Sequence, residues 1–181
     1  IAANCVPPTV NYCCGYGIYK VTLNTINNTT ANGVDGYKDY SCPQQTTLIQ
    51  DSAYSIFVQT SPTNAQDTRV WIDLNNNGIF ETTELRFSSS NTFNATGTIT
   101  IPACTVLNTP LRMRVFSDNA GSNPGPCSNA TKGQAEDYTI IVIPDTSAPI
   151  AKFAANVTSS CSGSIVFADS SLKTPTSWLW D

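Results

Sequence analysis

Short segments that alternate apolar and polar residues constrain the fold of this chain most strongly. The segment Leu-Arg-Met-Arg-Val-Phe at residues 111–116 should bury Leu111, Met113 and Val115 on one face of a β-strand. Residues 19–25 should do the same with Tyr19, Val21 and Leu23. Further strands are predicted at Thr47 and at residues 54–59, 69–73, 97–101 and 137–143, and the last is apolar on both faces, as in a central strand.

Turn signals separate these predicted strands. They include the dipeptides Asn32-Gly33 and Asp35-Gly36 and the proline at 102. Thr, Asn and Ser supply most of the polar residues, so helix formers are scarce. The spacing predicts an all-β fold, specifically an antiparallel β-sandwich or jelly roll.

Charge and hydropathy exclude two classes of partner. Only 12% of residues are charged and the formal net charge is -4, which argues against nucleic acid because phosphate binding needs clustered Lys and Arg. A membrane-spanning helix needs a run of about 18 apolar residues, and the sequence contains none.

The seven cysteines indicate disulfides in an oxidising compartment, outside the cell. There is no Cys-x-x-Cys pair and no His, so zinc and thioredoxin-like chemistry are poorly supported. Cys42 and Cys104 both lie near ends of predicted strands, and we expect them to pair. We further expect Cys127 to pair with Cys13 or Cys14 and Cys5 with the remaining vicinal cysteine, which leaves Cys161 for the second domain.

The segment DLNNNGIFETTE, residues 73–84, has the spacing of a twelve-residue calcium loop. It has oxygen-bearing side chains at positions 1, 3, 5, 9 and 12 and a glycine at position 6. A β-strand precedes it, so an ion here would stabilise a connection between strands, whereas an EF-hand moves helices. The predicted Ca²⁺ ligands are Asp73, Asn75, Asn77, the Ile79 carbonyl, Glu81 and Glu84; the alternative is an Asn-Gly turn with solvated acids.

Pairs of acidic residues elsewhere in the sequence are candidates for catalytic carboxylates. Glu136 and Asp137 could form a second ligand pair or, with Glu81 and Glu84, a glycosidase-like pair. The alternative, which we favour, is a cap or turn before the central strand. Without His there is no Ser-His-Asp chemistry within this segment, so we predict no catalytic residue and no enzyme activity.

A short segment with a proline at each end predicts a boundary between two domains. Residues 144–149, Pro-Asp-Thr-Ser-Ala-Pro, have the composition of a short stiff linker. We expect a β-sandwich over residues 1–143. Residues 150–181 contain three predicted strands, at 151–154, 163–168 and 177–181, which are too few to bury two tryptophans, so we expect the second domain to be incomplete.

Several ordered motifs resemble a known family, the GEVED domain, over about residues 11–143. They are Asn-Tyr-Cys at 11–13, residues 19–28, Gly-Tyr-Lys-Asp-Tyr at 36–40, residues 70–80, residues 111–115, and Gly-Gln-Ala-Glu-Asp-Tyr at 133–138. The last departs from the family's Gly-Glu-Val-Glu-Asp signature at Gln134 and Ala135. Residues 149–181 resemble the start of a PKD domain, an Ig-like β-sandwich, with Trp-Leu-Trp-Asp at 178–181.

These resemblances imply a large multidomain protein of the Bacteroidota, exported by the type IX system to the cell surface or medium. Such proteins often act as adhesins or filaments, and we expect a non-catalytic, calcium-stabilised module that mediates adhesion or assembly. The expected partners are other β-modules of the same polypeptide, neighbouring subunits, or an extracellular polysaccharide or cell-surface ligand. The alternative is an accessory, carbohydrate-binding domain of a secreted hydrolase. Asp51-Ser52-Ala53 matches a short O-glycosylation motif, so Ser52 is a candidate glycosylation site.

Overall fold

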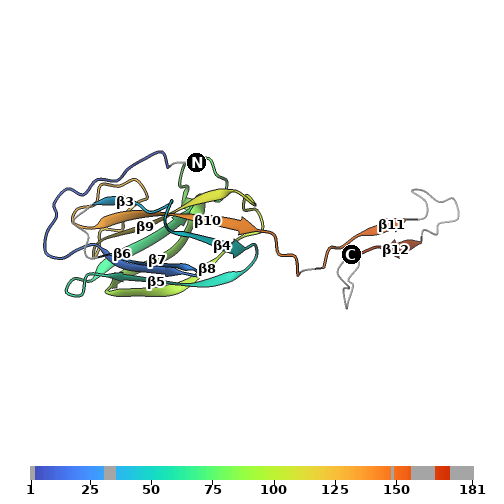
Figure 1. The fold of residues 1–181 in the computed structure, drawn as a ribbon, viewed down its shortest axis with the longest axis horizontal. Helices are drawn as coiled ribbons and strands as arrows, with labels where there is room; N and C mark the ends of the chain where they lie inside the picture. The colour runs from blue at the N-terminus through green and yellow to red at the C-terminus, as the bar shows by residue number, and fades with distance from the viewer. Residues whose placement is uncertain (1–2, 31–35, 148, 156–165, 172–181) are drawn as a thin grey trace. The chain divides into compact units, whose positions relative to one another are not determined.

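The computed structural model describes residues 3–30, 36–147, 149–155 and 166–171 (Figure 1). The chain divides into two units, Ile1–Pro144 and Asp145–Asp181. The strands of the first unit are β1 (Ile18–Leu23), β2 (Ile26–Thr29), β3 (Tyr37–Asp39), β4 (Gln45–Ile49), β5 (Ala53–Thr60), β6 (Gln66–Ile72), β7 (Leu85–Thr92), β8 (Asn94–Thr100), β9 (Pro110–Asn119) and β10 (Gln134–Ile143). The predicted all-β class is confirmed.

Two sheets form the sandwich of the first unit. One has the strand order β2-β1-β5-β8 and is antiparallel throughout. The other has the order β3-β10-β9-β6-β7, with β4 also paired to β10. Strand β10 is therefore central, as predicted, with β9 on one side and both β3 and β4 along the other (Figure 1).

The pairing of β3 and β4 differs from the expected antiparallel sandwich, because both strands run parallel to β10. Strand β3 runs along one edge of β10. After Tyr40 the chain leaves this edge, and it then returns to the same edge of β10 to form β4. Backbone hydrogen bonds from Tyr40 to Asp137 and from Thr139 to Gln44 hold the two ends of this turn on β10. Since the direction of the chain does not reverse at this turn, both pairings are parallel.

The hydrophobic core lies between the two sheets. Leu111, Met113 and Val115 are buried in it, as the alternation predicted. The prediction for residues 19–25 is wrong at Tyr19, which is only partly buried, whereas Ile18 is fully buried. A register shift between Ile18 and Lys20 causes this change, because a β-bulge interrupts the period of two.

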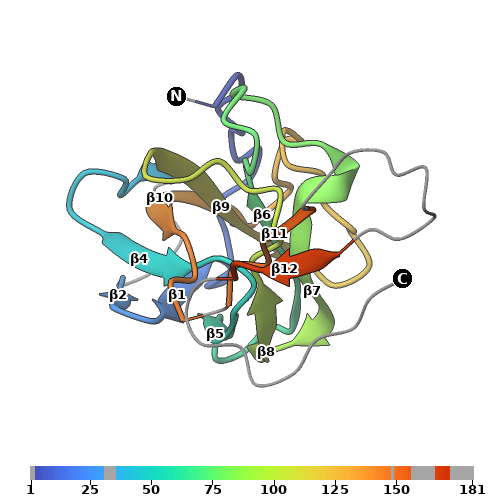
Figure 2. The same ribbon diagram turned by 90° about the vertical axis from the view of Figure 1, so that its right-hand side faces the viewer.

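Side-chain hydrogen bonds close one open edge of the sandwich. The Asn24 side chain donates to the Thr46 hydroxyl and to the Thr47 carbonyl, and the Thr25 hydroxyl donates to the Gln45 carbonyl. These bonds join the β1–β2 turn to β4, which lies beside β1 and β2 in Figure 2. They satisfy part of an edge that would otherwise expose backbone groups.

The second unit contains an antiparallel pair, β11 (Phe153–Ala155) and β12 (Phe167–Asp169). The Phe153 and Phe167 rings meet edge to face at 5.8 Å, and both remain mostly exposed. The strands predicted at 151–154 and 163–168 overlap this pair. The predicted strand at 177–181 and the turn dipeptide Asn32-Gly33 lie outside the described residues. Within the described parts of the chain, no helix has the length and apolar character needed to cross a membrane.

Candidate metal-binding loop and its buried support

The predicted calcium loop, residues 73–84, connects the neighbouring antiparallel strands β6 and β7. It begins directly after Ile72, and its last three residues form the 3-10 turn η1 (Thr82–Glu84) before β7 starts. Asn76 has φ 57° and Gly78 has φ 83°. The sharp turn therefore includes Gly78, the position at which a calcium loop places its glycine.

The oxygens predicted as ligands in the first half of the loop accept hydrogen bonds from its backbone. Asp73 Oδ1 accepts from Asn77 N at 3.0 Å and Asp73 Oδ2 from Gly78 N at 2.9 Å. Asn75 Oδ1 accepts from Asn77 N at 2.9 Å, and Asn77 Oδ1 accepts from Ile79 N at 2.7 Å. These bonds curl the chain around the buried Asp73 carboxylate, while Asn75 and Asn77 remain exposed.

Glu84 closes the loop from its other end and is only 3% exposed. Its Oε1 accepts hydrogen bonds from Leu74 N at 2.7 Å and from Asn75 N at 3.4 Å. Its Oε2 accepts from Glu81 N at 3.2 Å. Glu84, at the twelfth position, is thereby held beside Leu74 and Asn75 near the start of the loop. Calcium loops of this kind have a bidentate Glu at the twelfth position.

Glu81 lies on the outer side of the same loop. Its Oε1 accepts from Asn77 Nδ2 at 2.7 Å and its Oε2 from Asn75 Nδ2 at 3.4 Å. Each asparagine thus gives its oxygen to the backbone and its amide nitrogen to Glu81. The N–H groups of the two amides point their positive ends at the Glu81 carboxylate. A bound cation would take their place beside that carboxylate.

The two glutamates of the loop have pKa values shifted in opposite directions. Burial, together with a hydrogen bond to Glu81, raises the pKa of Glu84 to about 7. The hydrogen bond with Glu84 and those donated by Asn77 and Asn75 lower the pKa of Glu81. The ion pairs among described residues join Arg112 and Arg114 to Asp39 and Asp137, so Asp73, Glu81 and Glu84 take no part in them.

The donor set fits Ca²⁺ in kind, because it consists of carboxylate, amide and carbonyl oxygens only. Each accepting oxygen of Asp73, Asn75 and Asn77 has a second lone pair after its hydrogen bond is made, whereas Glu84 Oε1 already accepts two hydrogen bonds. Among the described residues, no three Asp, Glu, His or Cys side chains form a group that could hold a metal by themselves. A calcium site here would therefore need the asparagine oxygens and the Ile79 carbonyl, and calcium binding stays a prediction.

Glu136 and Asp137 lie inside β10 and are fully buried, so the expected cap or turn before the strand is wrong. Strand alternation directs their side chains to opposite faces of the sheet. Glu136 Oε2 accepts a hydrogen bond from Tyr138 Oη at 2.6 Å, and Tyr138 belongs to the core between the sheets. The interior accepts these polar groups because they hydrogen-bond one another.

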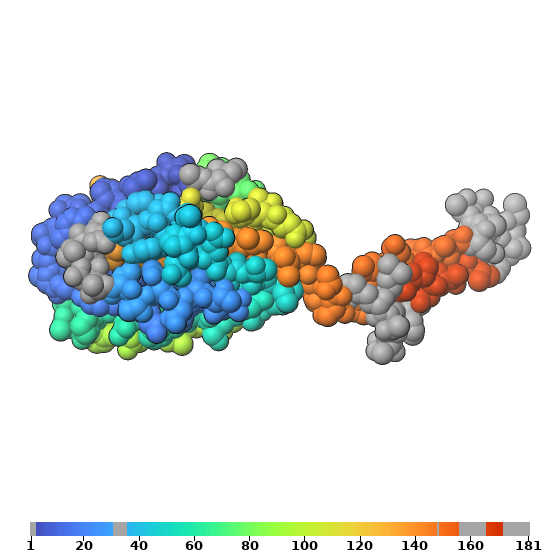
Figure 3. All heavy atoms as spheres, viewed as in Figure 1, coloured from blue at the N-terminus to red at the C-terminus, as the bar shows by residue number. Residues whose placement is uncertain are grey.

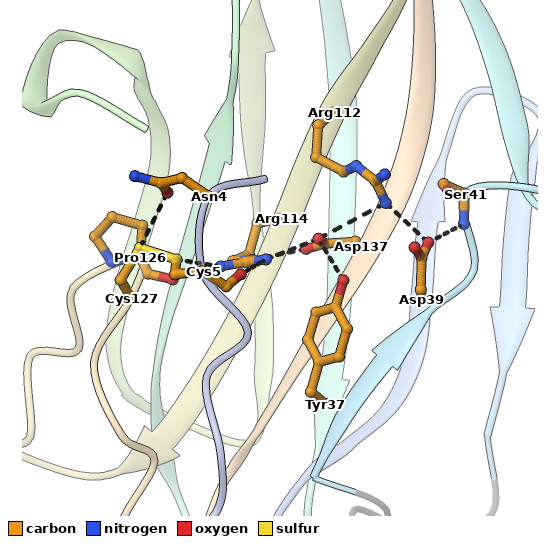
Figure 4. A network of polar contacts seen from close by, with 10 residues as sticks. All are labelled: Asn4, Cys5, Tyr37, Asp39, Ser41, Arg112, Arg114, Pro126, Cys127 and Asp137. Carbon is orange, nitrogen blue, oxygen red and sulfur yellow. Dashed lines mark hydrogen bonds and ion pairs between the residues drawn. A yellow bond between two sulfur atoms is a disulfide. The ribbon is translucent and has the colours of Figure 1, made fainter. Parts of the chain in front are cut away.

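Asp137 forms a buried ion pair with Arg114 on the outer face of the larger sheet (Figure 4). Arg114 Nε lies 2.7 Å from Asp137 Oδ1 and Nη2 lies 2.8 Å from Oδ2, and neither side chain is exposed. Tyr37 Oη donates to Asp137 Oδ2 at 2.9 Å. Burial, followed by the charge of Asp137, raises the pKa of Tyr37.

The remaining donors of Arg114 hold two distant segments. Nη1 donates to the Pro126 carbonyl at 2.8 Å, and Nη2 donates to the Cys5 carbonyl at 3.0 Å. The guanidinium also lies 5.0 Å from the Phe80 ring centre. Since Phe80 belongs to the 73–84 loop, Arg114 connects that loop to both Cys5 and Pro126.

A second, partly exposed ion pair lies beside the first (Figure 4). Arg112 Nη1 is 2.8 Å from Asp39 Oδ1 and 3.8 Å from Asp137 Oδ2. Partial burial alone would raise the pKa of Asp39, but hydrogen bonds from Ser41 and Arg112 and the Arg112 charge hold it below its ordinary value. Arg112 and Arg114 alternate with apolar residues along β9, so both face outward, away from the core.

The cysteines pair differently from the expected scheme. Cys5 is joined to Cys127, and Cys13 to Cys14. Cys42 and Cys104 are exposed and free. Cys42 precedes β4, whereas the segment containing Cys104 contacts the chain just beyond the other end of β4, where Gln50 Nε2 donates to the Ala103 carbonyl. The length of that strand separates the two cysteines. Cys161 lies outside the described residues.

The Cys5–Cys127 disulfide fixes the N-terminal strap, residues 3–12, across the molecule. The strap also forms a parallel bridge between Thr9 and Ala130, and Asn4 N donates to the Gly78 carbonyl of the candidate loop at 2.8 Å. Closing a loop with a sequence separation of 122 residues stabilises the fold by about 5 kcal/mol in the chain-entropy model.

Ser52, the candidate glycosylation site, is partly exposed in the turn before β5, and its carbonyl accepts a hydrogen bond from Ile101 N. The Ser52 side chain is therefore accessible to a modifying enzyme, and its glycosylation stays a prediction. Sequence reasoning missed the Arg114–Asp137 pair, Cys5 as the partner of Cys127, and the strap. The alternation at 111–116 predicts that Arg112 and Arg114 face outward. It does not identify the carboxylates that they pair with, because these depend on the register between strands.

These features define an all-β, disulfide-linked sandwich domain, compatible with an extracellular location, whose buried carboxylates are held by backbone amides and arginine. The GEVED domain family model matches residues 67–141, which is the segment from β6 into β10. The match includes the 73–84 loop, Arg112, Arg114 and Asp137, and it is shorter than the resemblance predicted over about residues 11–143. No curated protein matches the chain.

Proposed function

We propose that this chain contributes a non-catalytic, calcium-stabilised module to a secreted or surface protein, where it serves adhesion or assembly. A PKD-like second domain, type IX export and an origin in the Bacteroidota belong to the same proposal. The match of residues 67–141 to the GEVED domain family and the disulfide between Cys5 and Cys127 support this setting.

The geometry of the 73–84 loop carries the calcium part of the proposal. The oxygens of Asp73, Asn75, Asn77 and Glu84 accept bonds from the backbone of the same turn, and Glu84 is nearly inaccessible to water. Burying a carboxylate next to a second carboxylate is unfavourable unless a cation or a proton compensates it. The raised pKa of Glu84 has this cause.

The ion would be held by Asp73, Asn75, Asn77, the Ile79 carbonyl, Glu81 and Glu84, and when bound it would supply the positive charge that these oxygens lack. Glu81 would exchange its asparagine amide contacts for the ion, directly or through water. Phe80 packs against Arg114, and the Gly78 carbonyl accepts from Asn4, so a fixed loop also supports the strap.

The non-catalytic part rests on the carboxylates of β10. Asp137 is held by Arg114 and Tyr37, and Glu136 accepts from Tyr138 in the core. Both are fully buried, so a substrate could reach neither without opening the sheet. This arrangement favours a structural role for the Glu136-Asp137 pair over acid–base chemistry.

Isothermal titration of the full chain with calcium chloride tests the metal assignment. We expect binding in the range of about 10⁻⁴ to 10⁻³ M, weakened strongly in Glu84→Gln and unchanged in Asp51→Asn. Absence of calcium-dependent heat in the wild-type protein would show that the loop is an Asn-Gly turn. The sequence of the rest of the polypeptide tests the setting: more β-modules support adhesion or assembly, whereas a peptidase or glycosidase domain supports the accessory-domain alternative.

A further inference from the structure

The two sulfurs of the Cys5–Cys127 disulfide lie in different environments (Figure 4). Arg114 Nη1 is 3.1 Å from the Cys5 sulfur, and the Arg114 side chain is fully buried. Cys5 itself is partly buried, whereas Cys127 is exposed. Asn4 Oδ1, which carries no positive charge, lies 3.7 Å from the Cys127 sulfur.

This asymmetry matters for thiol–disulfide exchange. The attacking thiolate needs access to one sulfur, and the other sulfur must leave as a thiolate. A cation next to the leaving sulfur stabilises that thiolate and makes it a better leaving group. Cys127 is the exposed residue of the pair, and the sulfur next to a cation belongs to Cys5.

We propose that Cys127 is a thiolation site, at which an external thiol of low molecular weight displaces Cys5 and forms a mixed disulfide. The external thiolate attacks the Cys127 sulfur, and a new S–S bond forms there. The bond between Cys127 and Cys5 breaks, and its electron pair remains on the Cys5 sulfur as a thiolate. The step consumes one thiolate and produces one, so it needs no oxidant or reductant.

The charges around Arg114 allow it to stabilise this thiolate. Asp137 already occupies Nε and Nη2, so the donor directed at the Cys5 sulfur is Nη1, which also donates to the Pro126 carbonyl. Arg112 lies 3.8 Å from Asp137 Oδ2 and adds a second cation to the same cluster. The other titratable groups that contact this cluster are Asp39, which pairs with Arg112, and the neutral Tyr37 hydroxyl.

Thiolation would remove the covalent link only from the first part of the strap, where Arg114 Nη2 still donates to the Cys5 carbonyl. Residues after Pro8 stay bound, because Ala130 N donates to the Pro8 carbonyl and Val10 N donates to the Ala130 carbonyl. Asn4, whose backbone N–H donates to the Gly78 carbonyl of the 73–84 loop, lies in this part. Exchange at Cys127 therefore removes the covalent link of a segment that contacts the candidate calcium loop. The proposal for Cys127 itself does not depend on calcium.

Reaction of the folded full chain with glutathione tests the proposal. Cys42, Cys104 and Cys161 are changed to Ser so that no internal thiol competes. After a short reaction the mixture is acidified, free thiols are alkylated, and peptide mass mapping locates glutathione. We expect glutathione on Cys127 in excess over Cys5 by about tenfold or more, since a hydrogen bond to a charged group carries that difference. Equal labelling, preference for Cys5, or labelling only in denaturant overturns the proposal.

Arg114→Lys tests the role of the cation. Lysine can keep a charge opposite Asp137 but has no separate Nη1 donor for the Cys5 sulfur. We expect the preference for Cys127 to fall toward equal labelling, provided that circular dichroism shows a folded chain. An undiminished preference in a folded variant contradicts the role of Arg114. If the variant does not fold, the labelling pattern of the protein with native Arg114 decides the proposal.

Discussion

Arg114 and Asp137 stand directly opposite each other on β9 and β10, and their side chains form two hydrogen bonds of 2.7 and 2.8 Å without any exposure to water. Nη1 also donates to the Pro126 carbonyl, and Nη2 to the Cys5 carbonyl. Removing two charges from water is costly, and it is tolerated here because both side chains are hydrogen-bonded on several sides. The pair fixes the β9–β10 register and attaches the strap to the sheet.

Loss of one partner of this pair should therefore be severe. In Asp137→Asn the buried guanidinium loses its counter-charge, and we expect the free energy of unfolding to fall by about 3–5 kcal/mol. Urea unfolding at neutral pH measures it. The matched control is Asp39→Asn, where the carboxylate is 45% exposed and the pair with Arg112 contributes about 0–1 kcal/mol. Similar losses in the two variants would contradict a special role for the buried pair.

Gly133, at the entrance to β10, tolerates no side chain. A Cβ atom there would lie 1.8 Å from the Ser117 carbonyl oxygen and 2.6 Å from the Asp118 Cα, which are both backbone atoms. We expect Gly133→Ala to destabilise the domain by about 4 kcal/mol or more, because the strands must separate to accommodate the methyl group. In the control Gly125→Ala the added Cβ meets only the flexible Ser128 hydroxyl at 3.0 Å, and thermal unfolding should change little.

Removal of calcium should affect the 73–84 loop more than the whole domain. With a site of about 10⁻⁴ M and millimolar calcium, binding adds roughly 1.4 kcal/mol to the free energy of unfolding. For a domain of this size, chelation should lower the Tm by about 2–6 °C. Limited proteolysis between Ile72 and Leu85 should accelerate more noticeably, since the disulfide holds the rest of the fold.

Variants of the loop distinguish the ligands. Glu84→Gln should remove most of the calcium-dependent part of the Tm, Glu81→Gln should remove less if position 9 binds through water, and Asp51→Asn should remove none. The difference between Tm values with and without calcium is the relevant measurement, because Glu84 also accepts backbone hydrogen bonds. A chelator that changes neither Tm nor proteolysis would rule out the calcium site.

Stability should decline at alkaline pH. Burial, followed by the charge of Glu136, raises the pKa of Tyr138, so the folded state holds its hydroxyl proton more tightly than the unfolded chain does. A folded-state pKa above the unfolded value contributes stability that is complete below about pH 10 and is lost as the pH rises further. Chemical unfolding across this range should show a falling free energy, with a shallower fall in Tyr138→Phe. A free energy that stays level above pH 10 would be inconsistent with a buried, protonated Tyr138.

The parts of the fold that could be predicted from the sequence are those governed by hydrophobic periodicity. Residues 111–116 and 137–143 became β9 and the central β10 because alternation and a continuous apolar run depend on local sequence alone. β7 was not predicted, since its segment Leu-Arg-Phe-Ser-Ser-Ser-Asn-Thr is mostly polar. Pairing with β6 holds it in the sheet, and such tertiary pairing overrides weak strand propensity.

The buried polar interior and the disulfides were beyond sequence reasoning for a similar reason. Glu136 and Asp137 suggested a cap or turn, but Glu136 accepts from Tyr138 in the core and Asp137 pairs with Arg114, while Gln134 Oε1 accepts from Ile18 N across the sandwich. Cys5 and Cys127 are brought together by the strap, whose course depends on Arg114 and on the Thr9–Ala130 bridge. The order of oxygen-bearing residues in the 73–84 loop, by contrast, is entirely local, and the structure folds that segment into a compact turn with Gly78 at positive φ.

The Cys5–Cys127 disulfide also determines how the domain would respond to tension. Force applied before Cys5 and after Pro144 would pass through the S–S bond directly to Cys127 and then along β10. The 122-residue separation between the two cysteines, about 400 Å of extended chain, would be shielded from the load. Only the segment containing β10 could be drawn out, against its hydrogen bonds to β3, β4 and β9. One covalent bond thereby makes most of the sandwich mechanically inextensible while it remains closed.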